Sequence, residues 1–148
     1  MIVEEIMTRK EVTIKSSDTL YKAQGLMVKN SIRHLPVTQQ KELEGIITES
    51  DIRGAFVQND KNSSRITVLD PKKMKVADFM TRNPQTVDPE TNIEDAALLV
   101  YKNKIGSLPV IKDNELVGII SILDMLGLFI DLMGIIHSSS RVDVIMGK

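Results

Sequence analysis

Cysteine and tryptophan are absent from this sequence, and histidine occurs only at His34 and His137. Without thiols, the chain forms neither disulfides nor thiolate metal sites. No carboxylate stands at a metal-binding spacing from either histidine. The sequence also has no phosphate-binding loop of the P-loop kind and no G-x-S-x-G motif. We therefore expect no metal site, no catalytic residue and no enzyme activity.

A strong excess of charge of one sign is also absent. The formal net charge is −1, which gives no reason to expect nucleic acid or an anionic membrane as the main partner. The most apolar stretch, residues 123–136, is interrupted by Asp124 and Asp131 and is too short to cross a bilayer. The first residues lack the basic and then apolar layout of a secretory signal. We expect a soluble cytoplasmic protein of one compact domain or two packed halves.

One stretch of the sequence occurs twice, and the copies align without a gap when residue i is placed over residue i+73. The matching pieces are Met-Thr-Arg at 7–9 and 80–82, Leu-Pro-Val at 35–37 and 108–110, and Glu-Leu-x-Gly-Ile-Ile-Thr/Ser-x-x-Asp at 42–51 and 115–124. Such a repeat is one supersecondary unit written twice. We expect two halves related by a pseudo-two-fold axis, with two related clefts between them.

Each copy predicts a short extended piece, a helix, a strand, a polar turn, a second strand and a second helix. Asp18 is expected to cap the first helix of copy one, which runs to about residue 30. A capping-box pattern begins at Thr91 in copy two. The inward-facing residues of these helices are predicted to be Leu20, Ala23 and Met27 in copy one, and Ile93, Ala96 and Val100 in copy two. The β-branched runs after each glycine predict strands at 43–48 and 116–121, preceded by strands at 35–38 and 108–111.

The fold class is therefore α+β, with two tandem β-α-β-β-α repeats. We place repeat one at residues 1–57, a polar and turn-rich linker at 58–73, repeat two at 74–135 and a tail at 136–148. Ile66, Val68 and Leu69 could form a short packed piece within the linker. His137 is expected to be an exposed residue of the tail.

The second helix of copy two, which begins near Leu123, is apolar on nearly every side. A helix without a polar face must be covered all round. A subunit interface along this helix would provide the cover and predicts a homodimer. The alternative is simple burial in the core of one chain.

The repeated pattern resembles the CBS domain, and the tandem copies resemble a CBS pair (Bateman module) over roughly residues 3–132. The closest resemblance is to CBS proteins of the acetoin-utilisation type, whose members begin much like residues 1–7 and carry Ile-Arg-His-Leu-Pro-Val as at 32–37. In those proteins an ACT domain follows the pair, and residues 138–146 resemble its first strand. Either most of an ACT domain is missing here or this part of the resemblance is accidental.

Two short motifs, Thr48-x-x-Asp51 and Ser121-x-x-Asp124, stand where a strand gives way to a helix. One interpretation is a helix cap, with a hydroxyl on the first free N–H groups and a carboxylate at the positive end of the helix dipole. The other is ligand binding, because free N–H groups at a helix start favour phosphate and a carboxylate accepts hydrogen bonds from a ribose diol. CBS domains that bind adenosine compounds use this element in the second way. The two interpretations are compatible.

The resemblance implies that residues before the Leu-Pro-Val strand of one repeat face the Asp of the other. The first cleft would then contain Val12, Thr13, Arg33, His34, Ser121 and Asp124. The second would contain Thr48, Asp51, Thr86 and Ser107, beside Ile105 and Gly106. Arginine is a permanent, fork-shaped phosphate ligand, so we expect the tighter anion site at Asp124.

The resulting hypothesis is a regulatory CBS pair that binds AMP, ADP, ATP or S-adenosylmethionine between the repeats and signals through its dimer interface. Adenosine nucleotide would be a regulatory ligand rather than a cofactor. Acetoin utilisation is suggested only by the type of CBS protein that the sequence resembles. The alternative is a ligand-free dimerisation or interaction module. An enzyme is a third and weaker hypothesis.

Overall fold

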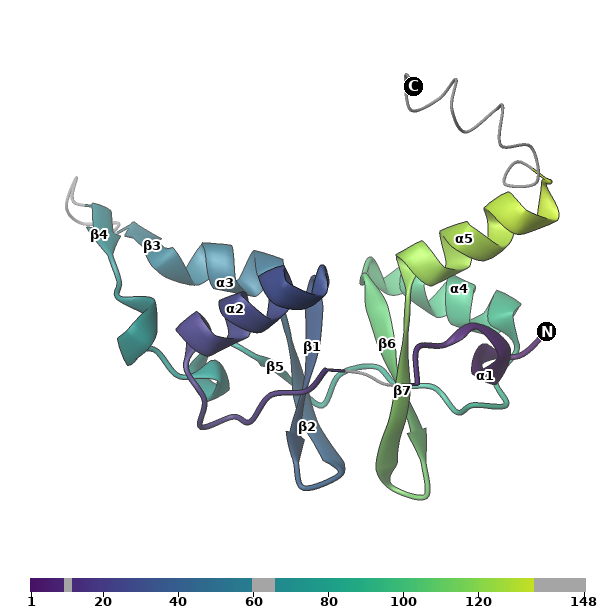
Figure 1. Ribbon diagram of the computed structural model, residues 1–148, viewed down its shortest axis with the longest axis horizontal. Helices are drawn as coiled ribbons and strands as arrows, with labels where there is room; N and C mark the ends of the chain where they lie inside the picture. Colours follow the sequence, from purple (N-terminus) through teal and green to yellow (C-terminus); the bar gives the residue numbers. More distant parts are fainter. Residues whose placement is uncertain (10–11, 60–65, 135–148) are drawn as a thin grey trace.

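The structure is a computed structural model that describes residues 1–9, 12–59 and 66–134. Two similar halves stand side by side, each with a β-hairpin below and two helices above (Figure 1). The first half contains α2 (Leu20–Asn30), β1 (His34–Gln39), β2 (Glu42–Thr48) and α3 (Glu49–Phe56). The second contains α4 (Ile93–Asn103), β6 (Ser107–Lys112), β7 (Glu115–Ser121) and α5 (Ile122–Leu132). The predicted α+β fold with a duplicated unit is confirmed.

The two hairpins have the same register. Leu35 pairs with Ile47 in the first, and Leu108 pairs with Ile120 in the second, 73 residues further along. Both hairpins contain one irregularity at the equivalent place, after Val37 and after Val110. The sequence repeat is therefore a repeat of backbone geometry, including its bulge.

The segment that precedes each repeat is exchanged between the halves. The short helix α1 (Val3–Ile6) packs in the second half, where it contacts α5, and Thr8 exchanges two backbone hydrogen bonds with Ile119 of β7. The equivalent strand β5 (Thr81–Arg82) pairs with β2 of the first half. The core clusters follow the same exchange, because Val3 and Met7 are buried in the second half while Met74, Val76 and Met80 are buried in the first. Neither half could complete its core from its own repeat.

The glycine in each Gly-Ile-Ile run has a steric explanation in this exchange. A methyl group on Gly45 would lie 2.6 Å from the carbonyl oxygen of Thr81. A methyl group on Gly118 would lie 2.8 Å from the carbonyl oxygen of Thr8. Glycine in a strand often marks such a close approach of another backbone. The exchanged segments can pair with β2 and β7 only because these positions carry no side chain.

The helices bury the predicted residues, but two predicted caps are wrong. Leu20, Ala23 and Met27 are buried in the first core, Ala96 and Val100 are buried in the second, and Ile93 packs against it. The N-cap of α2 is Thr19, whose hydroxyl accepts from the backbone N–H of Lys22 at 3.2 Å. Asp18 instead accepts from the backbone N–H of Lys15 and from the Lys22 ammonium. The N-cap of α4 is Asn92, and Thr91 accepts from the N–H of Asp88 one turn earlier.

The connection between the halves is more ordered than a plain linker. β3 (Val57–Asn59) and β4 (Ile66–Val68) pair in an antiparallel hairpin, and the 3₁₀ turns η1 (Pro71–Lys73) and η2 (Val76–Asp78) follow. Leu69 packs against the first core. Residues 60–65 lie outside the described part of the chain. So does the tail at 136–148, including His137 and the predicted ACT-like strand.

The halves meet along β2 and β7 at the centre of the molecule (Figure 1). Near the hairpin turns, the backbone N–H of Leu116 donates to the carbonyl of Lys41 at 3.0 Å. No helix in the described residues is long and apolar enough to cross a membrane.

Candidate functional site

The predicted Thr/Ser-x-x-Asp motifs form reciprocal caps at the strand-to-helix turns. Thr48 Oγ1 accepts from the N–H of Asp51 at 3.1 Å, and Asp51 Oδ2 accepts from the N–H of Thr48 at 2.9 Å. Ser121 and Asp124 make the same pair of bonds at 3.2 and 2.7 Å. The cap interpretation is therefore confirmed. Among the described residues, no donor contacts Oδ1 of either aspartate, so each carboxylate keeps an acceptor for a ligand.

The two turns differ in one hydrogen bond. The hydroxyl of Ser121 also donates to Asp124 Oδ2 at 2.9 Å. Asp51 and Asp124 are each half-buried, which is the environment of a group that a small molecule can reach and partly desolvate. A carboxylate held by its own backbone in this way is pre-oriented for a diol.

The predicted extended pieces run beside the first strand of each half. Ile14 bridges Val37 in parallel, and Val87 bridges Val110 in the same way. These bridges hold Val12 and Thr13 at the edge of β1, and Thr86 at the edge of β6. Val12 packs partly on the first core, whereas Thr13 and Thr86 are exposed.

Strand pairing brings the residues at the strand starts next to the caps of the same half. His34 is the register partner of Thr48, and Ser107 is the partner of Ser121. The N–H of Glu49 donates to the carbonyl of Arg33 at 2.9 Å, which locks the segment before β1 onto the start of α3. The equivalent bond joins Ile122 and Gly106 at 3.0 Å.

His34 also reaches the other half, because its imidazole contacts the backbone at Gly106. Burial and the neighbouring Arg33 guanidinium lower the pKa of His34, against the opposing effect of the Asp51 carboxylate. A neutral imidazole therefore lies at the junction of the two halves. No bulkier residue than glycine fits at position 106 while His34 keeps this position.

Ser107 is the one predicted site residue with an unpartnered buried polar atom. Its side chain is 95% buried, and its hydroxyl has no hydrogen-bond partner among the described residues. A buried hydroxyl without a partner is costly, so such groups call for an explanation. Its place opposite Ser121 puts this hydroxyl close to the cap of α5.

The structure groups the predicted site residues by half. Val12, Thr13, Arg33, His34, Thr48 and Asp51 belong to the first half, while Thr86, Ser107, Ser121 and Asp124 belong to the second. Within the described contacts, the ionic partner of Arg33 is Glu49, with Nε and Oε2 3.6 Å apart. The grouping of Arg33 with Asp124 across the halves therefore stays a prediction, while the His34–Gly106 contact joins the two sets.

Sequence reasoning missed Glu49 and Arg53. Glu49 forms ion pairs with both Arg33 and Arg53, the second with Nε and Oε1 3.9 Å apart, and so makes a small charge cluster at the Thr48–Asp51 turn. The signal was the i, i+4 spacing of Glu49 and Arg53 in a predicted helix, which is typical of a surface ion pair.

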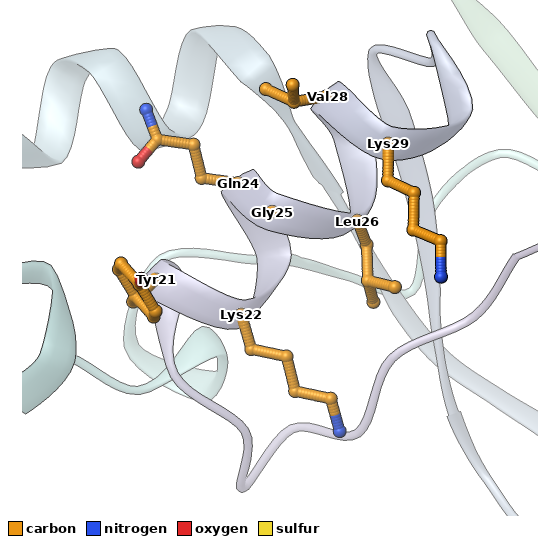
Figure 2. A pocket seen from close by; sticks show the side chains of 7 residues that line it. All are labelled: Tyr21, Lys22, Gln24, Gly25, Leu26, Val28 and Lys29. Carbon is orange, nitrogen blue, oxygen red and sulfur yellow. The ribbon is translucent and has the colours of Figure 1, made fainter.

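Two surface depressions lie among the helices, one away from these turns and one that borders the turn of Ser121 and Asp124. One, of about 550 Å³, runs over the outer side of α2, as Figure 2 shows for Tyr21, Gln24 and Val28. The other, of about 810 Å³, lies between α4 and α5 and includes Gly106 and Ile122. The first contains none of the predicted site residues, and all of its lining residues belong to one helix.

Comparison with known families identifies this arrangement. The family model described as the CBS domain matches residues 3–58 and again residues 76–131. The chain belongs to the CBS domain family. The match comprises two consecutive copies, so the chain carries a CBS pair.

Among related proteins, the pair makes up nearly the whole chain in one case and a small part of an enzyme in another. A CBS domain-containing protein of Dictyostelium discoideum is 32% identical over 139 residues, which cover 90% of this chain and 94% of the relative. The homoserine O-acetyltransferase of Methanococcus vannielii is 34% identical over 122 residues, which cover 81% of this chain. Those residues are only 23% of the enzyme, so this chain spans about a quarter of that relative.

Solved structures with the same fold include a CBS pair in complex with two adenosine compounds. An acetoin utilisation protein (AcuB) of Vibrio cholerae superposes with a TM-score of 0.77 at 29% identity, covering 93% of this chain and 98% of that one. The CBS pair of protein MJ0100, in complex with 5′-methylthioadenosine and S-adenosylmethionine, gives a TM-score of 0.74 at 28% identity. That comparison covers 87% of this chain and 95% of the other.

Proposed function

We propose that this CBS pair is a regulatory module that binds an adenosine-containing ligand between its halves. AMP, ADP, ATP and S-adenosylmethionine share the adenosine group and are the candidates. The ligand would lie against the two Thr/Ser-x-x-Asp turns, with its ribose on the aspartate and its charged group toward the helix start. The module has no catalytic role in this proposal.

The proposal rests on one observation, the acceptor oxygen that Asp51 and Asp124 each leave available for a ligand. Each uses Oδ2 to fix its own turn, while Oδ1 has no donor among the described residues. A related CBS pair, that of protein MJ0100, is similar in fold over 87% of this chain and was solved with two adenosine compounds. A pre-oriented acceptor pays little ordering entropy when a ligand arrives.

Phosphate binding at Asp124 would need Arg33 to leave Glu49. This ion pair is exposed, with 77% of the arginine side chain and 47% of the glutamate side chain accessible to solvent. Exposed pairs of this kind contribute about 1 kcal/mol or less. A phosphate offers arginine a bidentate partner. Moving Arg33 from Glu49 to a phosphate in the proposed first cleft, beside His34 and Asp124, would therefore cost little free energy. We retain the prediction that this cleft is the tighter anion site.

We also include a homodimer in the proposal. None of the residues of α5 is buried within one chain, so core burial does not explain why this helix is so apolar. A second copy would cover it. Ligand occupancy could then change the geometry of the dimer, provided that the two states of the dimer differ in affinity for the ligand. A role in acetoin utilisation has only the AcuB-like fold in its favour.

Calorimetric titration with ATP, AMP and S-adenosylmethionine tests the proposal. We expect saturable heat with at least one compound and a matching rise in the unfolding temperature, as linkage requires. The absence of both effects with all three compounds would favour the alternative, a ligand-free dimerisation or interaction module. Turnover of any of these three compounds would instead support the hypothesis that the protein is an enzyme.

A further inference from the structure

His34 is the predicted site residue whose charge changes nearest to neutral pH. It begins β1, where strand pairing sets it opposite Thr48, and its imidazole contacts the backbone at Gly106 of the second half. The residue is half-buried. The imidazole therefore lies beside the Thr48–Asp51 turn and at the junction of the halves, where the proposed function places the ligand.

Charged groups of the first half act on this imidazole in opposite directions. Burial and the Arg33 guanidinium lower the pKa of His34, while the Asp51 carboxylate of α3 offsets only part of that effect. Glu49 of the same helix pairs with Arg33, and 47% of the glutamate side chain is exposed. Without a ligand, the imidazole is therefore neutral at about pH 7 and above. A neutral imidazole has only one N–H to donate.

At the contact itself, the second half presents the uncharged backbone of Gly106 to the imidazole. Two charged residues adjoin this contact along the backbone. Lys104 stands two positions before Gly106, and Asp124 stands two positions after Ile122, whose N–H donates to the Gly106 carbonyl at 3.0 Å. Neither of these two residues shifts the pKa of His34. The protonation of the imidazole is therefore set by the first half and by whatever binds at the junction.

A phosphate group at this junction would reverse the balance of charge around His34. Its negative charge would lie next to the imidazole and would also compensate Arg33, which otherwise pairs with the exposed carboxylate of Glu49. An opposite charge within about 4–6 Å favours the charged form of a titratable group. The protonated imidazole would then donate a charge-assisted hydrogen bond, which is stronger than a bond from the neutral ring. An adenosine compound without phosphate offers His34 no such charge.

We propose that His34 makes the choice of ligand depend on pH. A phosphorylated adenosine compound binds together with a proton on this imidazole, whereas 5′-methylthioadenosine binds without one. The inference rests on the proposed function and adds how the same site distinguishes its ligands. Affinity for the phosphorylated compound then rises as the pH falls toward neutrality, by at most about tenfold per pH unit. The equivalent residue of the second half is Ser107, which does not titrate in this range, so the effect belongs to the cleft that contains His34.

Nuclear magnetic resonance titration of the histidine ring protons tests the inference, because the chain has only two histidines, His34 and His137. The spectrum of His34→Gln assigns the two signals. AMP or ATP, whichever binds more tightly in calorimetry, is compared with 5′-methylthioadenosine at saturation. We expect the pKa of His34 to rise with the phosphorylated compound and not with 5′-methylthioadenosine. The decisive pKa is measured in the parent protein, so the test does not require that the variant still bind nucleotide.

Calorimetry in buffers of different ionisation enthalpy counts the protons that are taken up on binding. At a pH of about 7.5, we expect the parent protein to take up more protons with the nucleotide than His34→Gln does. His137→Gln is the matched control and should equal the parent protein. Protonation of the phosphate itself is common to all three proteins, so the difference reports on His34.

The outcomes separate this inference from the proposed function. A bound nucleotide that leaves the pKa of His34 unchanged would overturn the inference while the proposed function stands. Binding of 5′-methylthioadenosine or S-adenosylmethionine, with no binding of AMP or ATP, would do the same. If none of these four compounds bound, the proposed function and this inference would both fall.

Discussion

The two halves of this protein share a backbone and differ in chemistry at its edges. Leu35 and Ile47 are buried in the first half in the same way as Leu108 and Ile120 in the second. The helix-start turns carry the same reciprocal caps in both halves. In contrast, Arg33 and His34 of the first half correspond to Gly106 and Ser107 of the second. The buried positions that make the unit fold are the same, and the positions at the junction of the halves and on the outer surface have diverged.

This difference shows which contacts depend on both halves at once. The imidazole of His34 can lie against the second half only because the residue that it meets there, Gly106, has no side chain. A symmetric pair of Arg-His segments would place two large side chains where one fits. Asymmetry is thus a packing requirement at the junction, and it would make the two predicted clefts chemically unequal.

The largest expected effect on stability comes from disrupting the backbone pairing between each exchanged segment and the strand of the opposite half. Gly45→Ala and Gly118→Ala should each lower the free energy of unfolding by about 3 kcal/mol, because the added methyl group meets a backbone carbonyl that cannot move independently. Thermal or urea unfolding measures this loss. The two losses of unfolding free energy should be similar, since the backbones of equivalent segments lie against both glycines.

The matched control is Gly25→Ala in α2, where a methyl group meets nothing within 4 Å. Alanine favours a helix interior over glycine by about 1 kcal/mol, so this variant should be more stable than the parent protein. If Gly45→Ala proved as harmless as Gly25→Ala, the exchange would not constrain the fold as described.

The contact between His34 and Gly106 should give the next largest effect. Gly106→Ala should cost about 2 kcal/mol of stability, because the methyl group displaces the imidazole from the junction. In a double-mutant cycle, combining it with His34→Ala should recover most of the loss. Strict additivity of the two single changes would show that the side chain does not cross between the halves.

The comparison of the two turns becomes sharper when ligand is added. Asp124→Ala should weaken nucleotide binding about 10-fold more than Asp51→Ala, since only the cleft at Asp124 is predicted to recruit Arg33. Each variant loses one cap of the same geometry, worth about 1 kcal/mol. Their unfolding temperatures should therefore fall by similar amounts, with a slightly larger fall for Asp124→Ala, which also loses the bond from the Ser121 hydroxyl. Equal losses of affinity in calorimetry would defeat the predicted inequality of the clefts.

The smallest effect concerns the protonation of His34. Its pKa is lowered in the folded protein by burial and by Arg33. As the pH falls below about 6.5, the unfolded chain binds this proton before the folded protein does, so the free energy of unfolding decreases. His34→Gln should show a shallower decrease over this range, measured by unfolding at a series of pH values. An identical pH dependence in both proteins would contradict the half-buried position of the imidazole.

The sequence predicted the strands and helices well because their signals are local. Helical spacing at Leu20, Ala23 and Met27 and the β-branched run after each glycine depend only on near neighbours. The caps were less predictable. Asp18 and Thr91 are both good capping residues, but each lies one position before the observed cap and serves the preceding turn. Competing hydrogen bonds within a few residues decide such positions.

The local geometry of the two turns could be predicted from the sequence, while the grouping of Arg33 with Asp124 across the halves stays a prediction. The Thr/Ser-x-x-Asp turns could be located because a strand-to-helix turn fixes hydroxyl and carboxylate on neighbouring N–H groups. The partner of Arg33 could not, because Glu49 competes for it from the adjacent helix turn. The unpartnered hydroxyl of Ser107 was invisible in the sequence, since burial of one side chain depends on everything packed around it.

By itself, the sequence determined the duplicated unit, its secondary structure and the residues of its two turns, because periodicity, β-branching and capping act over short distances. Only the tertiary structure decided that Thr8 and Thr81 pair with the opposite repeats, since the two repeats offer equivalent strands and the chain alone does not say which one is used. It also decided that His34 crosses to Gly106 and that the α5 helix stays uncovered. These features arise from long-range packing, in which one residue's position depends on residues far away in the chain.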